Sequence, residues 1–278
     1  METVIGKRVL ITGAAMGMGR LYALRALDEG ASALALWDIN SVELERTVAE
    51  LRARDKSNRT QLQPQIVDVS KLESIVDAAD NVRSEFGAID ILINNAGIVR
   101  GRPFWEHHQV RDTWMTMAIN ALAPMYLARE FINEMIANTA GECRIVNIAS
   151  AAGTISNPKM SVYCGSKWAA IGWSDSVRLE LEQAGHDHVK VTTVCPSYVA
   201  TGMFDGAKAP LLTPILTPEI VVNRVWAAML TGKPMLMMPW TVRLAALCKG
   251  VLPLPVWDWI ADRVFGVYHT MDAFKGRG

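Results

Sequence analysis

Short apolar runs recur along the chain, and longer stretches with helical spacing of apolar residues lie between them. The apolar runs are at residues 8–12, 33–37, 65–67, 89–93, 144–148, 190–195 and 234–238. The stretches with helical spacing cover residues 21–29, 41–54, 71–86, 110–138, 161–183 and 217–232. Because such short runs suit strands buried on both faces, the alternation predicts an α/β fold. We expect one doubly wound, Rossmann-type parallel sheet of about seven strands with helices on both faces.

One predicted helix contains a proline. Pro124 lies inside segment 110–138 and should kink or interrupt it, because proline lacks the N–H that an α-helix pairs. Asn120 lies in the same segment, where asparagine is a poor helix former. It is either a satisfied polar group of the core or a group that holds a water near a site.

The chain continues past its last predicted strand with an extension, residues 240–278, in which two helices are expected around Pro253 and Pro255. Much of this extension is apolar, and three roles stay open for it: covering a substrate, contacting another subunit, or making a peripheral contact with a membrane surface. We interpret residues 1–278 as a single domain.

Composition argues against several classes of protein. Half of the 278 residues are hydrophobic, and 28 Lys and Arg balance 28 Asp and Glu, so the basic surplus of a nucleic-acid-binding protein is missing. The four cysteines have neither CxxC nor zinc-type spacing. Uninterrupted apolar runs of about 18 residues are also missing. We therefore expect a cytoplasmic protein with reduced thiols, no metal site, no nucleic-acid partner and no transmembrane segment.

A glycine-rich turn directly follows the first predicted strand. Residues Thr12–Gly19 read TGAAMGMG, so that three glycines have the spacing GxxxGxG before a predicted helix. This context is typical of a dinucleotide site, since glycines let the backbone approach a pyrophosphate that rests on helix amides. A tight turn that binds nothing is the alternative.

An acidic residue, Asp38, ends the second predicted strand. A carboxylate there can accept hydrogen bonds from both ribose hydroxyls of adenosine and repels a 2′-phosphate, which favours NAD over NADP. The alternative is that Asp38 only caps the helix predicted at 41–54. Arg20, near the glycine-rich turn, weakens the preference for NAD.

Tyr163 and Lys167 lie four residues apart on the helix predicted at 161–183. Such residues share a helix face, with Cβ atoms about 5–6 Å apart. A lysine cation there should lower the tyrosine pKa from about 10, which makes Tyr163 a candidate general acid/base. The alternative is a packed ring beside a solvated charge. Ser150 follows the fifth predicted strand, at the edge where α/β proteins form ligand sites.

Three separated motifs carry a resemblance to a known family. They are TGxxxGxG at Thr12–Gly19, NNAG at Asn94–Gly97 and YxxxK at Tyr163–Lys167. The sequence resembles the classical short-chain dehydrogenases/reductases from about Val4 to Met238. Its last residues also resemble the tails of the retinol and hydroxysteroid dehydrogenase-like branch.

The resemblance implies a role for each matching residue. Tyr163 would exchange the proton of a substrate hydroxyl, and Ser150 would steady the substrate oxygen. Lys167 would hold the nicotinamide ribose and lower the Tyr163 pKa, while Asn120 would hold a water of a proton relay. The implied cofactor-binding residues are Gly13, Met16, Gly17, Met18, Gly19, Asp38, Ile39, Asp68, Val69, Asn95, Ala96, Gly97, Tyr163, Lys167, Pro196, Val199 and Thr201. The implied substrate-binding residues are Ser150, Ala152, Tyr163, Met203 and Phe204.

These inferences predict an NAD-dependent oxidoreductase that interconverts a secondary alcohol and its ketone by hydride transfer. The resemblance implies that the loop 200–217 is a lid over the substrate, and the apolar residues of this loop favour a small hydrophobic substrate. Open alternatives are an NADP-dependent carbonyl reductase, a lyase or an epimerase of the same fold, and a non-catalytic NAD(H)-sensing protein. The resemblance also implies a homodimer or homotetramer, packed through segments 110–138 and 161–183.

Overall fold

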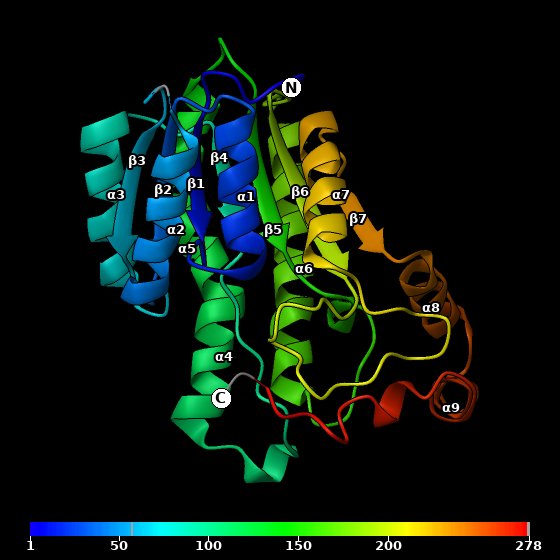
Figure 1. Ribbon diagram of the computed structural model, residues 1–278. Coiled ribbons are helices and arrows are strands. Elements are labelled where there is room, and N and C mark those ends of the chain that lie inside the picture. The colour runs from blue at the N-terminus through cyan, green and yellow to red at the C-terminus, as the bar shows by residue number, and fades with distance from the viewer. Residues whose placement is uncertain (57, 277–278) are drawn as a thin grey trace.

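One parallel sheet organises residues 1–56 and 58–276, the part of the chain that the computed structural model describes. Seven strands of this part have the order β3-β2-β1-β4-β5-β6-β7, and every neighbouring pair is parallel (Figure 1). They are β1 (Arg8–Thr12), β2 (Ala33–Asp38), β3 (Gln61–Ile66), β4 (Ile91–Asn94), β5 (Cys143–Ile148), β6 (Val189–Pro196) and β7 (Met235–Met238). The strand order reverses between β1 and β4, where α/β sheets bind ligands at the carboxyl ends of their strands. The predicted doubly wound sheet is confirmed.

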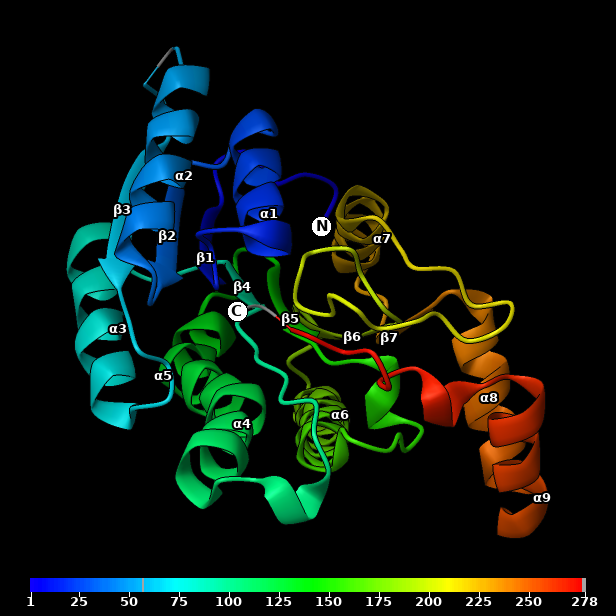
Figure 2. The same cartoon turned by 60° about the horizontal axis from the view of Figure 1, so that its bottom comes forward.

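Helices cover both faces of this sheet (Figure 2). The face that carries α1 (Gly17–Asp28), α2 (Ser41–Arg54) and α7 (Pro218–Thr231) holds one apolar core. The other face carries α3 (Leu72–Phe86), α5 (Ala123–Ala137) and α6 (Ser161–Gln183) with a second core.

The two cores explain why the strands are continuous apolar runs. Along β1, Val9 and Ile11 belong to the core beneath α1, whereas Leu10 belongs to the core on the opposite face. All three side chains are fully buried. Parallel strands with both faces covered need apolar residues at every position, not at every second one.

The third strand differs from its prediction. β3 spans Gln61–Ile66, whereas residues 65–67 were expected, and its sequence QLQPQI is mostly polar. β3 lies at the edge of the sheet, where a proline such as Pro64 is tolerated because one side of the strand needs no ladder partner. An apolar run was therefore the wrong signal for this strand.

Segment 110–138 is interrupted, as Pro124 predicted. Wide π-helical turns at Gln109–Trp114 and Ala118–Leu122 flank the short α4 (Met115–Met117) before α5 begins. Pro124 lies in the first turn of α5, where an α-helix has no partner for an N–H anyway. Asn120 therefore lies in a wide turn rather than in a regular helix.

The C-terminal extension packs against the loop that follows β6. It forms α8 (Trp240–Val251), α9 (Leu254–Trp259) and short turns up to His269. Two main-chain hydrogen bonds hold its last part: Lys208 N–H donates to Thr270 C=O at 2.8 Å, and Lys275 N–H donates to Asp205 C=O at 2.9 Å. The extension thus lies below the carboxyl edge of the sheet (Figure 1). Its residues 277 and 278 lie outside the described residues.

Among the helices of the described residues, none combines the length and the apolar character that are needed to cross a membrane.

Candidate active site

The carboxyl ends of β1 and β4 are tied together by side chains. Asn95 donates to the main-chain oxygen of Thr12 at 3.0 Å, and the Thr12 hydroxyl accepts from the N–H groups of Asn95 and Ala96. Asn94 donates to the side-chain oxygen of Asn147 on β5 at 2.8 Å. The asparagines of the NNAG motif therefore hold three strand ends in a fixed relation.

A groove runs along this edge and contains most of the predicted cofactor residues. Those that line it are Gly13, Met16, Gly17, Met18, Asp38, Ile39, Asp68, Val69, Asn95, Ala96, Gly97 and Thr201. The first amides of α1 also lie here, because α1 begins at Gly17 and not at the predicted residue 21. Met16 precedes the helix without a side-chain cap, so these amides are available to an anion.

Gly19 has a packing role rather than a place in the groove lining. A Cβ atom at this position would lie 1.9 Å from the Gly13 carbonyl oxygen and 2.8 Å from the Asn95 amide nitrogen. Only glycine therefore lets α1 lie this close to the turn after β1. Gly13 itself has a φ of +64°, in the left-handed region that favours glycine. The turn is a cradle that a larger residue would fill, which fits a bound pyrophosphate.

The Asp38 carboxylate is oriented by main-chain groups. It accepts hydrogen bonds from Ala15 N–H and Asn40 N–H, both at 2.9 Å. The helix-cap alternative for Asp38 is wrong, because the side chain of Asn40 caps α2 by accepting from Glu43 N–H at 3.1 Å. Asp38 stays in the groove lining, where a ribose would meet it.

Arg20 is engaged by a carboxylate. Its guanidinium makes two hydrogen bonds to Glu50 of α2, at 2.7 and 2.5 Å. A bidentate pair of this kind neutralises the arginine that weakened the preference for NAD.

Several groove residues were not among the predicted cofactor-binding residues. They are Trp37, Asn40, Val67, Ile98, Ile119 and Met203. Most of them are neighbours of predicted residues, so a wider window around each strand end would have found them. Met203 was predicted to bind substrate, yet it lines the groove and not the apolar cavity described below. Pro196 ends β6 and Val199 lies in the loop after it, and neither of these predicted cofactor residues lines the groove.

Ser150, Tyr163 and Lys167 come together at the end of β5. All three are buried, with exposed fractions of 6%, 5% and 5%. The Tyr163 hydroxyl faces the side chain of Ser150, which favours the ionised form of the phenol. The Lys167 ammonium donates to the Ile148 carbonyl at 2.8 Å and lies 5.8 Å from the centre of the Tyr163 ring. The structure thus builds a phenol, a hydroxyl and an ammonium into one small volume.

The acid–base balance of this group differs from the prediction. Burial raises the pKa of Tyr163 above its ordinary value, and the neighbouring Ser150 side chain offsets this only in part. Burial also lowers the pKa of Lys167 to about 8. The expected depression of the Tyr163 pKa is therefore wrong for the polypeptide by itself, because the cost of desolvating a phenolate outweighs the attraction of this ammonium.

The side chain of Asn120 is fully engaged. Its oxygen accepts from Ile98 N–H at 2.9 Å, and its nitrogen donates to the Ile98 carbonyl at 2.9 Å and to the Ser166 hydroxyl at 3.1 Å. These bonds tie the loop after β4 to α6, next to Lys167. The geometry supports a positioning role for this side chain, and the predicted water relay stays a prediction.

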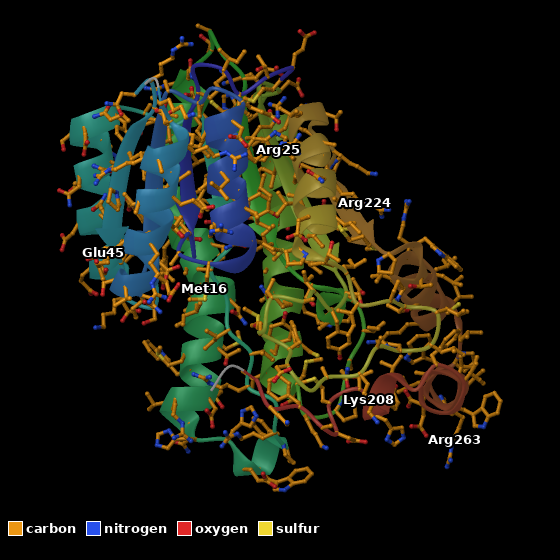
Figure 3. All side chains as sticks on the ribbon, viewed as in Figure 1. Met16, Arg25, Glu45, Lys208, Arg224 and Arg263 are labelled. Atoms are coloured by element: carbon orange, nitrogen blue, oxygen red, sulfur yellow. The ribbon has the colours of Figure 1, made fainter. Side chains whose placement is uncertain are left out.

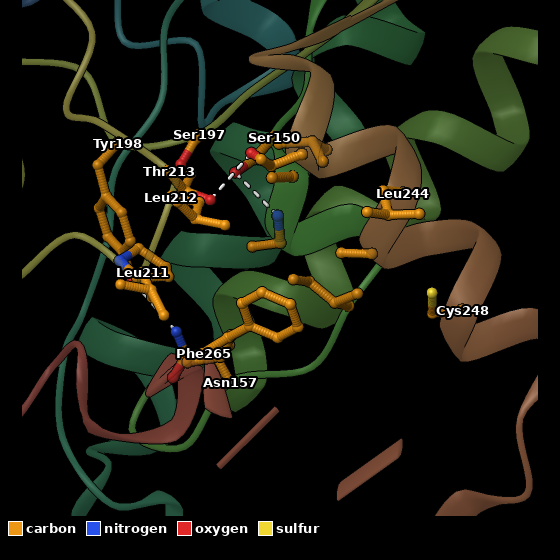
Figure 4. Close-up of a pocket in the computed structure, with 18 of the residues that line it drawn as sticks. Ser150, Asn157, Ser197, Tyr198, Leu211, Leu212, Thr213, Leu244, Cys248 and Phe265 are labelled. Atoms are coloured by element: carbon orange, nitrogen blue, oxygen red, sulfur yellow. Dashed lines mark hydrogen bonds between the residues drawn. The ribbon is translucent and has the colours of Figure 1, made fainter. Parts of the chain in front are cut away.

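An apolar cavity opens on the Tyr163 side of the site (Figure 4). Ser150, Ala152, Tyr163 and Phe204 line it, as the substrate prediction required. Phe204 meets the Tyr163 ring edge-on, with ring centres 5.9 Å apart. Further lining residues come from the loop after β6: Tyr198, Pro210, Leu211, Leu212 and Thr213.

The C-terminal extension supplies another wall of this cavity, which the sequence left as one of three roles. Its lining residues are Trp240, Thr241, Val242, Leu244, Ala245, Cys248, Trp257, Phe265 and Val267. A buried polar cluster anchors it, in which the Thr270 hydroxyl lies 2.8 Å from both the Asn157 amide and the Tyr198 hydroxyl. Nothing in the sequence motifs pointed to this cluster, because its members are far apart along the chain.

Comparison with known proteins agrees with this geometry. A family model described as short chain dehydrogenase matches residues 7–211. The chain is 37% identical over 280 residues to epidermal retinol dehydrogenase 2 of Mus musculus, covering 99% of this chain and 87% of that protein. It is 36% identical over 254 residues to estradiol 17-beta-dehydrogenase 11 of Homo sapiens, covering 91% and 81%.

A solved structure shows the same arrangement. A short chain dehydrogenase/reductase from Burkholderia phymatum in complex with NAD superposes with a TM-score of 0.79 at 26% identity, over 90% of this chain and 96% of that chain. With the motifs, the sheet order and the relatives in agreement, this chain belongs to the short-chain dehydrogenase/reductase family, in the branch of the retinol and hydroxysteroid dehydrogenases, and is an oxidoreductase.

Proposed function

We propose that this enzyme uses NAD to interconvert a hydrophobic secondary alcohol and its ketone, with Tyr163 as the general acid/base. One observation carries the proposal: Ser150 and Tyr163 line a cavity whose other walls are mostly apolar, and the adjacent Lys167 ammonium lies close to Gly97 of the dinucleotide groove. A substrate oxygen bound between these two hydroxyls would leave the rest of its molecule among apolar side chains.

The residues of the site suit this chemistry. The Tyr163 oxygen takes the proton of the alcohol in oxidation and returns it in reduction, while the Ser150 hydroxyl donates a hydrogen bond to the substrate oxygen as negative charge develops there. When bound, the oxidised nicotinamide accepts the hydride from the alcohol carbon and carries a positive charge that favours the phenolate. The low exposure of both hydroxyls keeps water away from the reacting oxygen.

Lys167 is charged under the conditions in which it has to act. Its pKa of about 8 leaves most of the population protonated at neutral pH. A cation in this low-dielectric surrounding attracts a phenolate more strongly than it would in water. Because Tyr163 alone has a raised pKa, we infer that its phenolate forms only when further positive charge joins Lys167.

NAD rather than NADP is the proposed cofactor. The Asp38 carboxylate is fixed by two main-chain donors and faces the groove, so a 2′-phosphate would be repelled. Glu50 neutralises Arg20, the cation that would otherwise favour that phosphate.

The names of the relatives support a lipophilic substrate. Retinol and estradiol, which those names contain, are alcohols attached to large apolar skeletons. The wall formed by Phe204, Leu211, Leu212 and Leu244 suits a skeleton of that kind. We therefore propose steroids and similar lipophilic secondary alcohols as the substrate class, while retinol, whose hydroxyl is primary, supports only the large apolar skeleton.

A substrate screen tests this proposal. Steroids, retinoids, terpene alcohols and aliphatic alcohols are each offered with NAD and with NADP, and the absorbance of the reduced nicotinamide is followed. Turnover should be fastest with lipophilic secondary alcohols and NAD. Activity confined to small polar alcohols would refute the apolar cavity as the substrate site.

Two further proposals concern the setting of the enzyme. We propose a homodimer or homotetramer in the cytoplasm, packed through α5 and α6, since α6 exposes Trp168 and Leu179 to 46% and 44%. Sedimentation velocity would test the assembly and cell fractionation the location. A monomer at all concentrations would contradict the first.

A further inference from the structure

The outer surface of the C-terminal extension is apolar although it is exposed. Its large exposed apolar side chains are Trp240, Leu244, Leu247, Val251, Leu254, Val256, Trp259 and Val264. At several of these positions more than half of the residue is exposed: Val251 is 73% exposed and Trp259 is 62% exposed. Contiguous apolar surface of this extent usually marks an interaction site.

The loop after β6 continues the same surface. It exposes Leu211, Leu212 and Ile215 to 56%, 65% and 47%. Two hydrogen bonds join it to the extension: Leu211 N–H donates to Phe265 C=O at 2.9 Å, and the hydroxyls of Thr213 and Thr241 lie 2.9 Å apart. We call these exposed side chains of the loop and of residues 240–264 the apolar rim.

The apolar rim borders the substrate cavity. Leu211, Leu212, Trp240 and Leu244 are exposed to solvent and also line the cavity. The same side chains therefore form the outer surface and the inner wall. The cavity opens toward an apolar surface, whereas the dinucleotide groove opens at the polar strand ends.

The charges within the apolar rim favour a lipid surface. Asp258 is bound by the Tyr268 hydroxyl at 2.6 Å, and Asp262 lies 3.0 Å from His269 and 3.3 Å from Arg263. Both acidic groups are thus engaged within the extension. The cation Arg263 lies beside α9 on the outside of the molecule (Figure 3).

One more cation, Arg243, is exposed on α8, whereas Lys249 of the same helix lies over the Trp168 ring of α6 and donates to the Ser156 hydroxyl. Exposed tryptophans interspersed with Lys and Arg are the composition that lies at the boundary between lipid and water.

The position of the cavity decides between a membrane and a second copy of the chain. A protein partner seated on the apolar rim would cover the exposed side chains at the cavity entrance and obstruct substrate exchange. A lipid surface would instead deliver lipophilic alcohols, which partition into a bilayer, directly to the entrance.

We propose that the apolar rim docks on the surface of a lipid bilayer that contains anionic lipid, so that substrate enters the cavity from the bilayer. This docking rests on the proposed function only in that the cavity takes a lipophilic alcohol. Vesicle binding is read without turnover, so failure of the docking and failure of the proposed function are distinguishable.

Vesicle flotation with two matched triple variants tests the proposal. The test variant carries Leu247→Glu, Val251→Glu and Trp259→Glu, at exposed positions that do not line the cavity. The control variant carries Ile5→Glu, Val42→Glu and Leu72→Glu, at exposed apolar positions on other elements. Thermal unfolding of both checks that they are folded.

Wild type and control should float with vesicles of phosphatidylcholine and phosphatidylserine. The test variant should partition into them more than about tenfold less, because it loses the burial of three apolar side chains. Failure of the wild type to float, or equal flotation of the test variant, would overturn the proposal. A third outcome would also overturn it: the wild type is an oligomer that does not bind vesicles, and the test variant is a monomer. The apolar rim would then be a contact between copies of the chain.

A second measurement does not depend on charged substitutions. Vesicles with brominated acyl chains quench the fluorescence of tryptophans that enter the bilayer. The wild type should be quenched, and Trp240→Phe with Trp259→Phe should lose most of that quenching while still floating, since phenylalanine preserves the apolar surface. Unchanged quenching in this variant would place another part of the molecule on the bilayer and contradict the proposal.

Discussion

Replacing Gly19 by alanine would place a methyl carbon 1.9 Å from the carbonyl oxygen of Gly13, within the turn that forms the dinucleotide groove. Ordinary contact with such an atom begins near 3.4 Å, so the start of α1 would have to move away by about 1.5 Å. The obstacle is main chain, which cannot rotate aside as a long side chain would. The first amides of α1 would therefore leave their place beside the turn.

The magnitude follows from two opposing effects. Alanine favours a helix over glycine by up to about 1 kcal/mol, whereas forcing an extra carbon into a packed site costs about 1–3 kcal/mol or more. We expect Gly19→Ala to lower the free energy of unfolding by about 1–2 kcal/mol. We also expect the Kd for NAD to rise at least about tenfold, a loss of about 1.4 kcal/mol in binding.

Isothermal titration calorimetry with NAD and urea unfolding measure the two effects. Gly172→Ala is the matched control, since a Cβ atom at this position of α6 meets nothing within 4 Å. It should stabilise the fold by about 0.5–1 kcal/mol and leave NAD binding unchanged. If Gly19→Ala binds NAD within twofold of wild type, the close approach of α1 does not shape the cofactor site.

Three further substitutions test other parts of the account. Asp38→Ala should raise the KM for NAD, because it removes hydrogen bonds to the ribose, and lower the KM for NADP, because it removes the repulsion of a 2′-phosphate. Steady-state kinetics in which the KM rises equally for both cofactors would contradict this. Burial lowers the Lys167 pKa from 10.5 to about 8, so between these pH values the unfolded chain binds more protons than the folded one, and the contribution of this group to the free energy of unfolding rises with pH. Lys167→Met should flatten that rise when denaturant unfolding is measured from pH 7 to 10.5. An unchanged slope would contradict the burial effect. Gly206→Ala would bring a Cβ atom 2.1 Å from the Ala273 carbonyl oxygen at a φ of +80°, and limited proteolysis should cut the end of the extension faster than in wild type.

Much of the fold could be predicted because its local signals agree with its tertiary structure. The strands that are buried on both faces, such as β1 and β2, can be recognised in the sequence as apolar runs that end at Gly or Asp. β3 escaped because an edge strand needs neither an apolar run nor freedom from proline. Its best-buried residue, Gln63, is polar, and its apolar Ile66 is exposed, so no apolar pattern marks this strand in the sequence.

The predicted catalytic residues met in space, yet their electrostatics could not be predicted. The four-residue spacing of Tyr163 and Lys167 told correctly that the two share a helix face, and the structure places Ser150 beside them. It could not tell how completely the site is buried, and burial decides the direction in which the Tyr163 pKa moves. Desolvation depends on every element packed around a group, which no local spacing records.

The walls of the proposed substrate cavity could not be predicted from the sequence. Its lining combines the loop after β6 with α8, α9 and the cluster around Thr270, all brought together by long-range packing. The sequence showed that this region is apolar but not which of its residues face Tyr163. Met203 illustrates the difficulty, because it lines the groove while its neighbour Phe204 lines the cavity.

Turnover of the Tyr163→Phe variant tests the central claim most directly. Phenylalanine preserves the ring that packs edge-on against Phe204 and removes only the hydroxyl that faces Ser150. With a lipophilic secondary alcohol and NAD, kcat should fall by about 10²–10⁴-fold or more, because general acid/base catalysis contributes about that much. The Kd for NAD should stay within about twofold of wild type, since the groove is lined by other residues. A variant that binds NAD normally and retains more than a tenth of the wild-type kcat would contradict the account.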